Sequence, residues 1–157
     1  MAYSQSDKTI TTEIEIEGSL AEVWEVLVDL EKWERWNPFI IQCEGQPIQG
    51  SKIKNTMISG GKKMVFKPRV QVVQKQKEFT WVGHLYIPGL FDGRHRFLIK
   101  EVGPSRVLLT QDEQFSGLLS GIILRKIGED TIASFEKMNE ALKAEVERRR
   151  GESSIHP

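Results

Sequence analysis

The first regular pattern in the chain is an alternation of apolar and polar residues from Ile10 to Glu17. Strict alternation of this kind predicts a strand that buries one face and exposes the other. The pattern then changes to that of a helix: Ser19 and Glu22 have the spacing of a capping box, and apolar residues recur at helical spacing as far as Leu27. We therefore expect a strand that is followed directly by a short amphipathic helix.

A second short helix should lie between Asp29, which can cap its start, and Pro38, which must end it. From residue 39 to residue 115, short apolar stretches are separated by turn signals, which predicts an antiparallel meander of about six strands. The turn signals are Gly45 to Gly50, Gly60-Gly61, Gln74 to Lys77, Pro88 to Gly93 and Gly103 to Ser105.

Each hairpin of this meander must place its two apolar faces on the same side of the sheet, and this condition fixes the expected strand register. In the last hairpin it places His95 on the inward face opposite Glu113, and Gln111 on the same face of the same strand as Glu113. The expected pairs are Met57 with Met64, Asn55 with Phe66, Val72 with Phe79, Val70 with Trp81, Leu85 with His95, Gly83 with Phe97, Phe97 with Gln111, Ile99 with Leu109 and His95 with Glu113.

The part of the chain after Phe115 has helical periodicity up to Arg150, either as one long helix or as two helices hinged at Gly128. Strand, two short helices, meander and long helix together make an α+β fold. We assign residues 9–150 to one domain, with a loose N-terminus over residues 1–8 and a frayed tail over residues 151–157. A single helix about 10 Å wide cannot fill a strongly curved sheet, so a cavity should remain between them.

The composition excludes several classes of protein. The 157 residues carry 22 basic and 22 acidic side chains, so we expect neither a nucleic-acid binder nor a highly charged disordered chain. No apolar run approaches the roughly 20 residues of a membrane span, so stable membrane insertion is not expected. The single cysteine, Cys43, favours a reducing compartment, and we expect a cytoplasmic protein. Because the three histidines lack metal-ligand spacing and there is no phosphate-binding loop, we expect no metal and no cofactor.

Short motifs follow one another along nearly the whole chain. They are Ile14 to Glu17 leading into Ala21 to Asp29, Trp33 with Trp36 to Ile40, Gly50-Ser51, Phe66 to Val70, Trp81 to Gly83, Leu90 to His95 with Phe97, Gln114 to Gly117, and Phe135 to Asn139 with Leu142-Lys143. This set resembles the START-like SRPBCC superfamily, in particular its polyketide cyclase/dehydrase-like branch. The resemblance implies a helix-grip fold, in which a curved seven-stranded antiparallel sheet wraps around the C-terminal helix and leaves a deep pocket for a hydrophobic small molecule. Members of the superfamily bind lipids, quinones, hormones or polyketides, or catalyse cyclisation and dehydration, so the fold alone does not determine function.

His95 is the first candidate for a functional side chain. On the inward face it should meet Glu113 and Gln111, because a buried imidazole and a buried carboxylate each need a partner. One interpretation is a polar end of the pocket that fixes a hydroxyl or carbonyl group of a ligand, or an acid/base pair that acts on it. The other is a structural contact that ties two strands together. His84 falls on the outward face and His156 in the tail, so neither is given a role.

Bulky apolar residues on the inward faces form the second group of candidates. Such residues are usually core, but a set of adaptable side chains across several strands also lines pockets for apolar ligands. Trp36 and Phe39 either cover one end of the core or form the mouth of the pocket, and the loop tip at Leu90 and Phe91 either gates it or meets a partner or membrane. The predicted ligand-binding residues are Trp36, Phe39, Met57, Phe66, Trp81, Leu85, His95, Phe97, Gln111, Glu113, Phe115, Phe135, Met138, Asn139 and Leu142.

Three functions follow from these interpretations. The first is the binding of a hydrophobic small molecule, such as a lipid, an isoprenoid or an aromatic polyketide, in a cavity between the sheet and the C-terminal helix. The second is a cyclase or dehydratase-type enzyme that uses His95 and Glu113 as an acid/base pair in the same cavity. The third is a protein-interaction module without a ligand, for which the sequence contains no partner motif.

Overall fold

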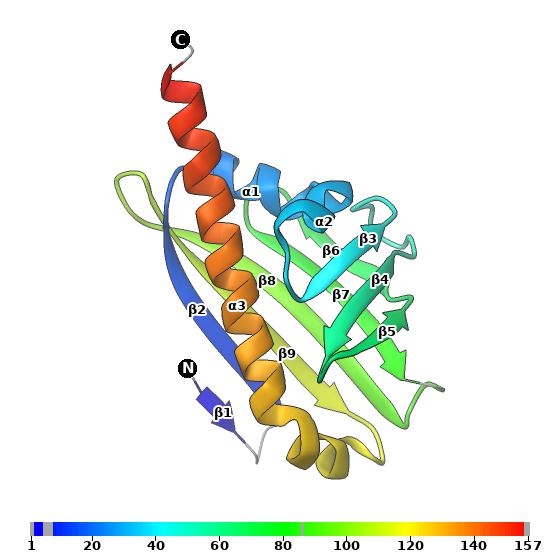
Figure 1. Ribbon diagram of the computed structural model, residues 1–157. Coiled ribbons are helices and arrows are strands. Elements are labelled where there is room, and N and C mark those ends of the chain that lie inside the picture. Colours follow the sequence, from blue (N-terminus) through cyan, green and yellow to red (C-terminus); the bar gives the residue numbers. More distant parts are fainter. Residues whose placement is uncertain (1, 5–7, 86, 156–157) are drawn as a thin grey trace.

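The structure, a computed structural model, describes residues 2–4, 8–85 and 87–155. Its strands form two antiparallel sheets (Figure 1). The first has six strands in the order β1 (Ala2–Ser4), β2 (Thr9–Glu17), β9 (Arg106–Ser116), β8 (Phe91–Gly103), β7 (Glu78–Leu85) and β6 (Arg69–Gln74). The second has three strands in the order β3 (Ile40–Glu44), β4 (Lys54–Ser59) and β5 (Lys62–Phe66).

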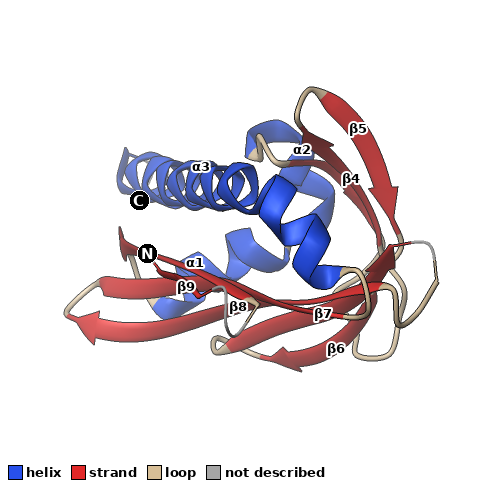
Figure 2. Cartoon of the chain, turned by 90° about the horizontal axis from the view of Figure 1, so that it is seen from below, coloured by secondary structure: helices blue, strands red, loops and turns tan. Residues whose placement is uncertain are grey.

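The division into two sheets differs from the single seven-stranded sheet that the resemblance implied. The meander is interrupted at Pro68, between the end of β5 and the start of β6, because proline has no N–H to donate to a neighbouring strand. The three-stranded sheet then rises at one side of the six-stranded sheet, and α3 (Ser120–Ile155) lies over the concave face (Figure 2). The α+β class is as predicted, and so is the curved antiparallel sheet that wraps around the long C-terminal helix.

The helices after β2 begin and end where the sequence signals place them. Helix α1 (Leu20–Val28) starts at a capping box in which the Ser19 hydroxyl accepts from the Glu22 N–H and the Glu22 carboxylate accepts from the Ser19 N–H. A 3-10 turn, η1 (Leu30–Lys32), leads into α2 (Trp33–Trp36), which ends before Pro38. Asp29 makes no side-chain capping bond and instead forms an ion pair with Lys32 at 2.8 Å, so its predicted capping role is wrong.

Most of the predicted strand pairs are confirmed, and three are wrong. A bulge after Val70 places Val72 opposite Thr80 instead of Phe79. The hairpin between β7 and β8 is shorter than predicted because β8 already begins at Phe91, so Leu85 faces Phe91 and Gly83 faces Gly93. The confirmed pairs are Met57 with Met64, Asn55 with Phe66, Val70 with Trp81, Phe97 with Gln111, Ile99 with Leu109 and His95 with Glu113.

Helix α3 is continuous through Gly128, although its first turns run at an angle to the rest (Figures 1 and 2). Of the predicted frayed tail, residues 151–155 continue this helix and residues 156–157 lie outside the described residues. Of the predicted loose N-terminus, residues 2–4 pair with β2, Lys8 is described, and residues 1 and 5–7 lie outside the described residues. Among the described residues, no helix is long and apolar enough to span a membrane.

Candidate functional site

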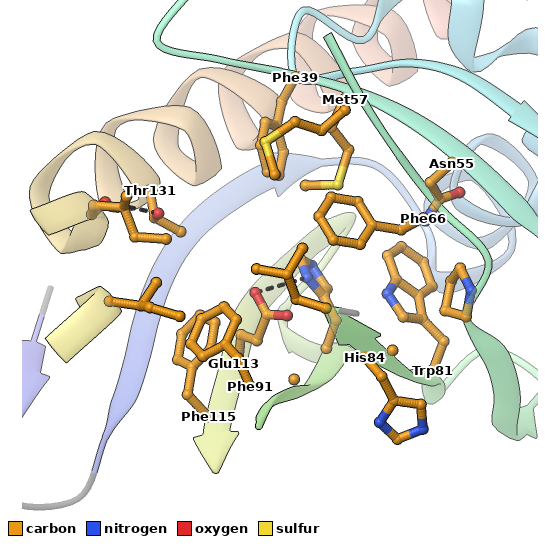
Figure 3. A pocket seen from close by; sticks show the side chains of 18 residues that line it. Phe39, Asn55, Met57, Phe66, Trp81, His84, Phe91, Glu113, Phe115 and Thr131 are labelled. Carbon is orange, nitrogen blue, oxygen red and sulfur yellow. Dashed lines mark hydrogen bonds and ion pairs between the residues drawn. The ribbon is translucent and has the colours of Figure 1, made fainter. Parts of the chain in front are cut away.

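A cavity of about 360 Å³ lies between the two sheets and the first half of α3 (Figure 3). Strands β4 and β5 form one wall, strands β7 to β9 form the opposite wall, and Ile123, Ile127 and Thr131 of α3 close one side. The volume falls within the range of pockets that hold small molecules, about 300–1,000 Å³. The predicted cavity therefore exists, but it occupies only one end of the concave face.

The predicted ligand-binding residues divide between this cavity and the core. Eight of them line the cavity: Phe39, Met57, Phe66, Trp81, Leu85, His95, Glu113 and Phe115. The other seven are not among the residues that line it: Trp36, Phe97, Gln111, Phe135, Met138, Asn139 and Leu142. Trp36 packs beside Trp33. The other six are at most 2% exposed, so they belong to the packed core between the sheet and α3.

Two glycines face each other across β7 and β8 in the wall of the cavity, where Gly83 leaves space free and Gly93 leaves room for the Glu113 carboxylate. Gly83 and Gly93 are directly paired, and both line the cavity. Neither has a positive φ, so these positions do not require glycine for their backbone conformation. They are the places where the inward face of the sheet carries no side chain. The sequence contains a signal for this gap, because each glycine shares the inward face with a bulky neighbour, Trp81 or His95. The two glycines were not among the predicted site residues.

His95 lies in the wall of the cavity and is only 2% exposed. Its ring is stacked on Trp81, with centroids 4.7 Å apart, and Phe97 and Phe135 flank it at 4.8 and 4.9 Å. Both ring nitrogens have polar neighbours: Nε2 is 2.9 Å from Oε1 of Gln111, and Nδ1 is 3.5 Å from Oε2 of Glu113. The predicted meeting of His95, Glu113 and Gln111 is therefore what the structure contains.

A chain of hydrogen bonds determines which ring nitrogen of His95 carries a proton. The Asn139 amide donates to the Thr12 hydroxyl at 2.8 Å, and the Gln111 amide donates to Oδ1 of Asn139 at 2.7 Å. Because the amide group of Gln111 donates, its Oε1 is the acceptor that faces His95, and His95 Nε2 must carry the hydrogen. Nδ1 is then the nitrogen that faces Glu113. Gln111 and Asn139 thus act behind His95 and do not contact the cavity.

The pair of His95 and Glu113 gives the cavity its polar end. The side chain of Glu113 is 17% exposed, against 3% for that of His95, so the carboxylate is the more accessible partner (Figure 3). At 3.5 Å, Nδ1 and the carboxylate are close enough to form an ion pair when the ring is protonated. Such a pair can accept a hydrogen bond from a ligand hydroxyl, and it can also exchange a proton with a bound molecule.

The loops at one end of the cavity are joined by backbone hydrogen bonds. The N–H groups of Leu118 and Leu119, before α3, donate to the carbonyls of Gly89 and Leu90 in the β7–β8 loop, at 3.0 and 2.9 Å. The rings of Phe91 and Phe115 are stacked, with centroids 5.3 Å apart, and both line the cavity. Of the loop tip that the sequence singled out, Phe91 therefore lines the cavity and Leu90 is tied to the start of α3.

A carboxylate on the outer side holds the same loop. The Asp92 carboxylate accepts from the Gly89 N–H at 3.0 and 3.1 Å and lies 2.7 Å from Nδ1 of His84. The hydrogen bond from His84 lowers the pKa of Asp92, with a smaller contribution from the Gly89 N–H. The His84 ring points away from the cavity, as its predicted outward face requires (Figure 3).

Two other kinds of functional site, a cysteine nucleophile and a metal site, are not supported by the described residues. Cys43 is buried, and burial raises the pKa of its thiol to about 12, which does not suit a nucleophile. In the described part of the chain, no three histidine, cysteine, aspartate or glutamate side chains are grouped so that they could hold a metal ion.

The lining residues that were not predicted as ligand-binding are Asn55, Met64, Pro68, Gly83, His84, Phe91, Gly93, Ile123, Ile127 and Thr131.

Several solved structures share this fold. A START superfamily protein from Mycobacterium smegmatis has 22% identity and a TM-score of 0.71, and the match covers 89% of this chain and 97% of that one. The ZhuI aromatase/cyclase from Streptomyces sp. R1128 has 14% identity and a TM-score of 0.73, covering 90% and 94%. A point mutant of norcoclaurine synthase from Thalictrum flavum, bound to a transition-state analogue, has 14% identity and a TM-score of 0.72, covering 91% and 96%. At these identities the likeness concerns the fold.

Comparison at the level of sequence gives the family. No curated protein matches the chain significantly. The family model described as "polyketide cyclase / dehydrase and lipid transport" matches residues 7–147, which is nearly the whole domain. This match over most of the chain shows that it belongs to the polyketide cyclase/dehydrase and lipid transport family.

Proposed function

We propose that this protein binds a hydrophobic small molecule in the cavity between its two sheets and α3. The observation that carries the proposal is an apolar cavity of about 360 Å³ with a polar pair, the buried His95 and the half-buried Glu113, in its wall. Binding sites for small molecules typically combine an apolar lining with a few polar groups that fix the orientation of the ligand. The family description, which includes lipid transport, is in keeping with such a role.

The two kinds of wall have different tasks in this proposal. The free energy of binding comes mainly from the burial of apolar surface, at about 25 cal/mol per Å². Met57 and Met64 are directly paired across β4 and β5, and their flexible side chains can adapt to the shape of a ligand. Glu113 and His95 decide which way round the ligand lies, because a hydroxyl or carbonyl group is more stable beside them than against the aromatic rings.

An enzyme of the cyclase or dehydratase type is the second candidate, and one observation favours it. The hydrogen-bond chain through Gln111 holds His95 with Nε2 protonated and directs Nδ1 toward Glu113, next to the cavity. A neutral His95 could take a proton from a carbon atom beside a ligand carbonyl, and the resulting imidazolium would be stabilised by the Glu113 carboxylate. The same proton could then return to a hydroxyl group that leaves as water. The third candidate, a protein-interaction module, has no such observation in its favour.

Native mass spectrometry of the protein purified from its own host tests the binding proposal. We expect a complex whose mass exceeds that of the chain by one defined ligand, released by organic solvent. The matched control is Gly83→Val, which places a side chain in the cavity without touching the polar pair. Recovery of wild-type protein with no added mass, together with no affinity for any apolar probe, would contradict the proposal.

His95→Gln separates binding from catalysis. If His95 is an acid/base group, the variant loses turnover of a β-keto substrate while its melting temperature changes little. If His95 only orients a ligand, the variant binds more weakly and no turnover exists to lose. If it mainly ties β8 to β9, the melting temperature falls and ligand affinity is retained, which would contradict a functional role for this side chain.

A further inference from the structure

On the inner face of the three-stranded sheet, Asn55 is a polar residue with apolar neighbours. The register of β4 places Asn55 directly opposite Cys43 of β3 and Phe66 of β5. In an antiparallel sheet, residues that face each other share one side of the sheet. On that side the neighbours of Asn55 are Ile40, Cys43, Met57, Met64 and Phe66, and the pair of polar residues Ser59 and Lys62 follows at the end of the hairpin.

The side chain of Asn55 is buried, and within the residues that the structure describes its amide oxygen is unpaired. The residue is 1% exposed, and its Oδ1 has no hydrogen-bond partner among the described residues. Even the thiol of Cys43, directly opposite, makes no hydrogen bond to it. Leaving a buried acceptor unpaired is unfavourable, and such atoms are rare in folded proteins. An apolar residue of the same size would avoid this cost, so the choice of asparagine calls for an explanation.

The position of Asn55 in the wall of the cavity explains why an asparagine is found there. It lines the cavity beside Phe66, Trp81 and Pro68, on the wall formed by the three-stranded sheet. Glu113 lies on the opposite wall, and Figure 3 shows the two residues at separate places around the cavity, with aromatic rings between them. The cavity therefore has two polar positions, one on each sheet, which are separated by apolar side chains.

We propose that Asn55 is a second polar anchor for the ligand, whose hydroxyl group hydrogen-bonds to the side-chain amide. This inference rests on the proposed binding function and narrows the class of ligand. The Glu113 carboxylate is an acceptor, and the Asn55 amide can present either its oxygen or its NH2 group to a hydroxyl, so the ligand that fits best is an apolar molecule with hydroxyl groups at two separated points. A diol is then preferred to a molecule with a single hydroxyl, and to the corresponding diketone.

Two matched probes test this inference by calorimetry: 4-hydroxybiphenyl and 4,4′-dihydroxybiphenyl, which have the same apolar body and one or two hydroxyl groups. We expect the wild-type protein to bind the diol about fivefold more tightly than the mono-ol. In Asn55→Leu this ratio should fall to about one, because the second hydroxyl has lost its hydrogen-bond partner. Met57→Leu, which changes the same wall without altering its polarity, should keep the wild-type ratio.

The outcomes separate this inference from the proposed function. If both probes bind and the ratio is the same in the wild type and Asn55→Leu, the second anchor is wrong and the binding cavity stands. If neither probe binds, both proposals fail together. Should Asn55→Leu not fold, a crystal structure of the wild-type protein with the diol decides. One hydroxyl oxygen within hydrogen-bonding distance of the Asn55 side-chain amide supports the anchor, and two hydroxyls placed elsewhere overturn it.

Discussion

The carboxylate of Glu113 lies directly over Gly93, in the space where any other residue would place its Cβ. A Cβ built on Gly93 would overlap Oε1 of Glu113, and Cδ of the same side chain would be only 3.2 Å away. Since Gly93 does not have a positive φ, its backbone would tolerate a side chain, and the requirement for glycine comes from this contact alone. The position of the polar group in the cavity therefore depends on the residue beneath it.

Gly93→Ala should displace the Glu113 carboxylate from its place beside His95. We expect the affinity for 4-hydroxybiphenyl to fall roughly tenfold, because the hydroxyl loses a charged acceptor. Calorimetric titration measures the effect. The control is Gly151→Ala in the exposed end of α3, where an added Cβ meets nothing within 4 Å. Unchanged affinity in Gly93→Ala would show that Glu113 does not contact the probe.

Gly83→Val should fill part of the cavity without disturbing the fold. A Cβ on Gly83 would meet only Pro68, at an ordinary contact distance of 3.5 Å, and valine is favoured in strands. We expect the free energy of unfolding to stay within about 1 kcal/mol of the wild type, while the affinity for 4-hydroxybiphenyl falls by about tenfold or more. Urea denaturation and titration measure the two quantities. If the variant binds the probe as tightly as the wild type, the probe must bind outside this cavity.

Two methionines distinguish the core from the cavity. Met138 is 1% exposed and packs beneath α3, whereas Met57 is half-buried and lines the cavity. Met138→Ala should lower the free energy of unfolding by about 2–5 kcal/mol and leave probe affinity within about twofold. Met57→Ala should destabilise less and weaken binding more. The reverse ranking in denaturation and titration experiments would mean that the ligand lies beneath the second half of α3.

Removal of the Asp92 carboxylate should change how stability depends on pH. The pKa of Asp92 is lowered in the folded state, first by the hydrogen bond from His84, so its contribution is complete above the unfolded-state pKa of about 3.9. That contribution is lost as the pH falls through the folded-state pKa. Asp92→Asn should therefore have a lower melting temperature than the wild type at about pH 6 and a similar one at about pH 2.

The control for this effect is Glu25→Gln, which removes an exposed carboxylate from α1. Its melting temperature should follow that of the wild type at both pH values. If the difference between Asp92→Asn and the wild type were the same at low and neutral pH, the contact with His84 would not be the source of the stability.

The sequence was sufficient to predict which residues of β7 to β9 face inward, even where the predicted partners were wrong. In β6 it was not, because the bulge after Val70 places Val73, and not Val72, opposite the inward Phe79. His95 pairs with Trp81 and not with Leu85, but the two partners are four residues apart, and an even shift leaves each side chain on the same face. The pairing of His95 with Glu113 was predicted correctly because the turn at Gly103 to Ser105 is short and well marked. Alternation therefore identified the inward set more reliably than it identified the contacts.

The place of the cavity along the concave face could not be predicted in the same way. Phe135, Met138 and Leu142 have the helical spacing of Ile123 and Ile127, yet the first group packs against the sheet and the second faces empty space. The difference arises from the angle at which α3 begins and from the three-stranded sheet that rises beside it (Figure 2). Both are tertiary features, to which local periodicity is insensitive.

The measurement that tests the central claim most directly is methyl NMR of the protein labelled with ¹³C at the methionine methyl groups. Met57 and Met64 line the cavity, and Met138 lies in the packed core. On titration with 4-hydroxybiphenyl, we expect saturable shifts of the Met57 and Met64 signals and little change for Met138, because aromatic rings shift only the methyl groups near them. The absence of shifts, or a shift of Met138 alone, would contradict the account of a ligand-binding cavity between the two sheets and α3.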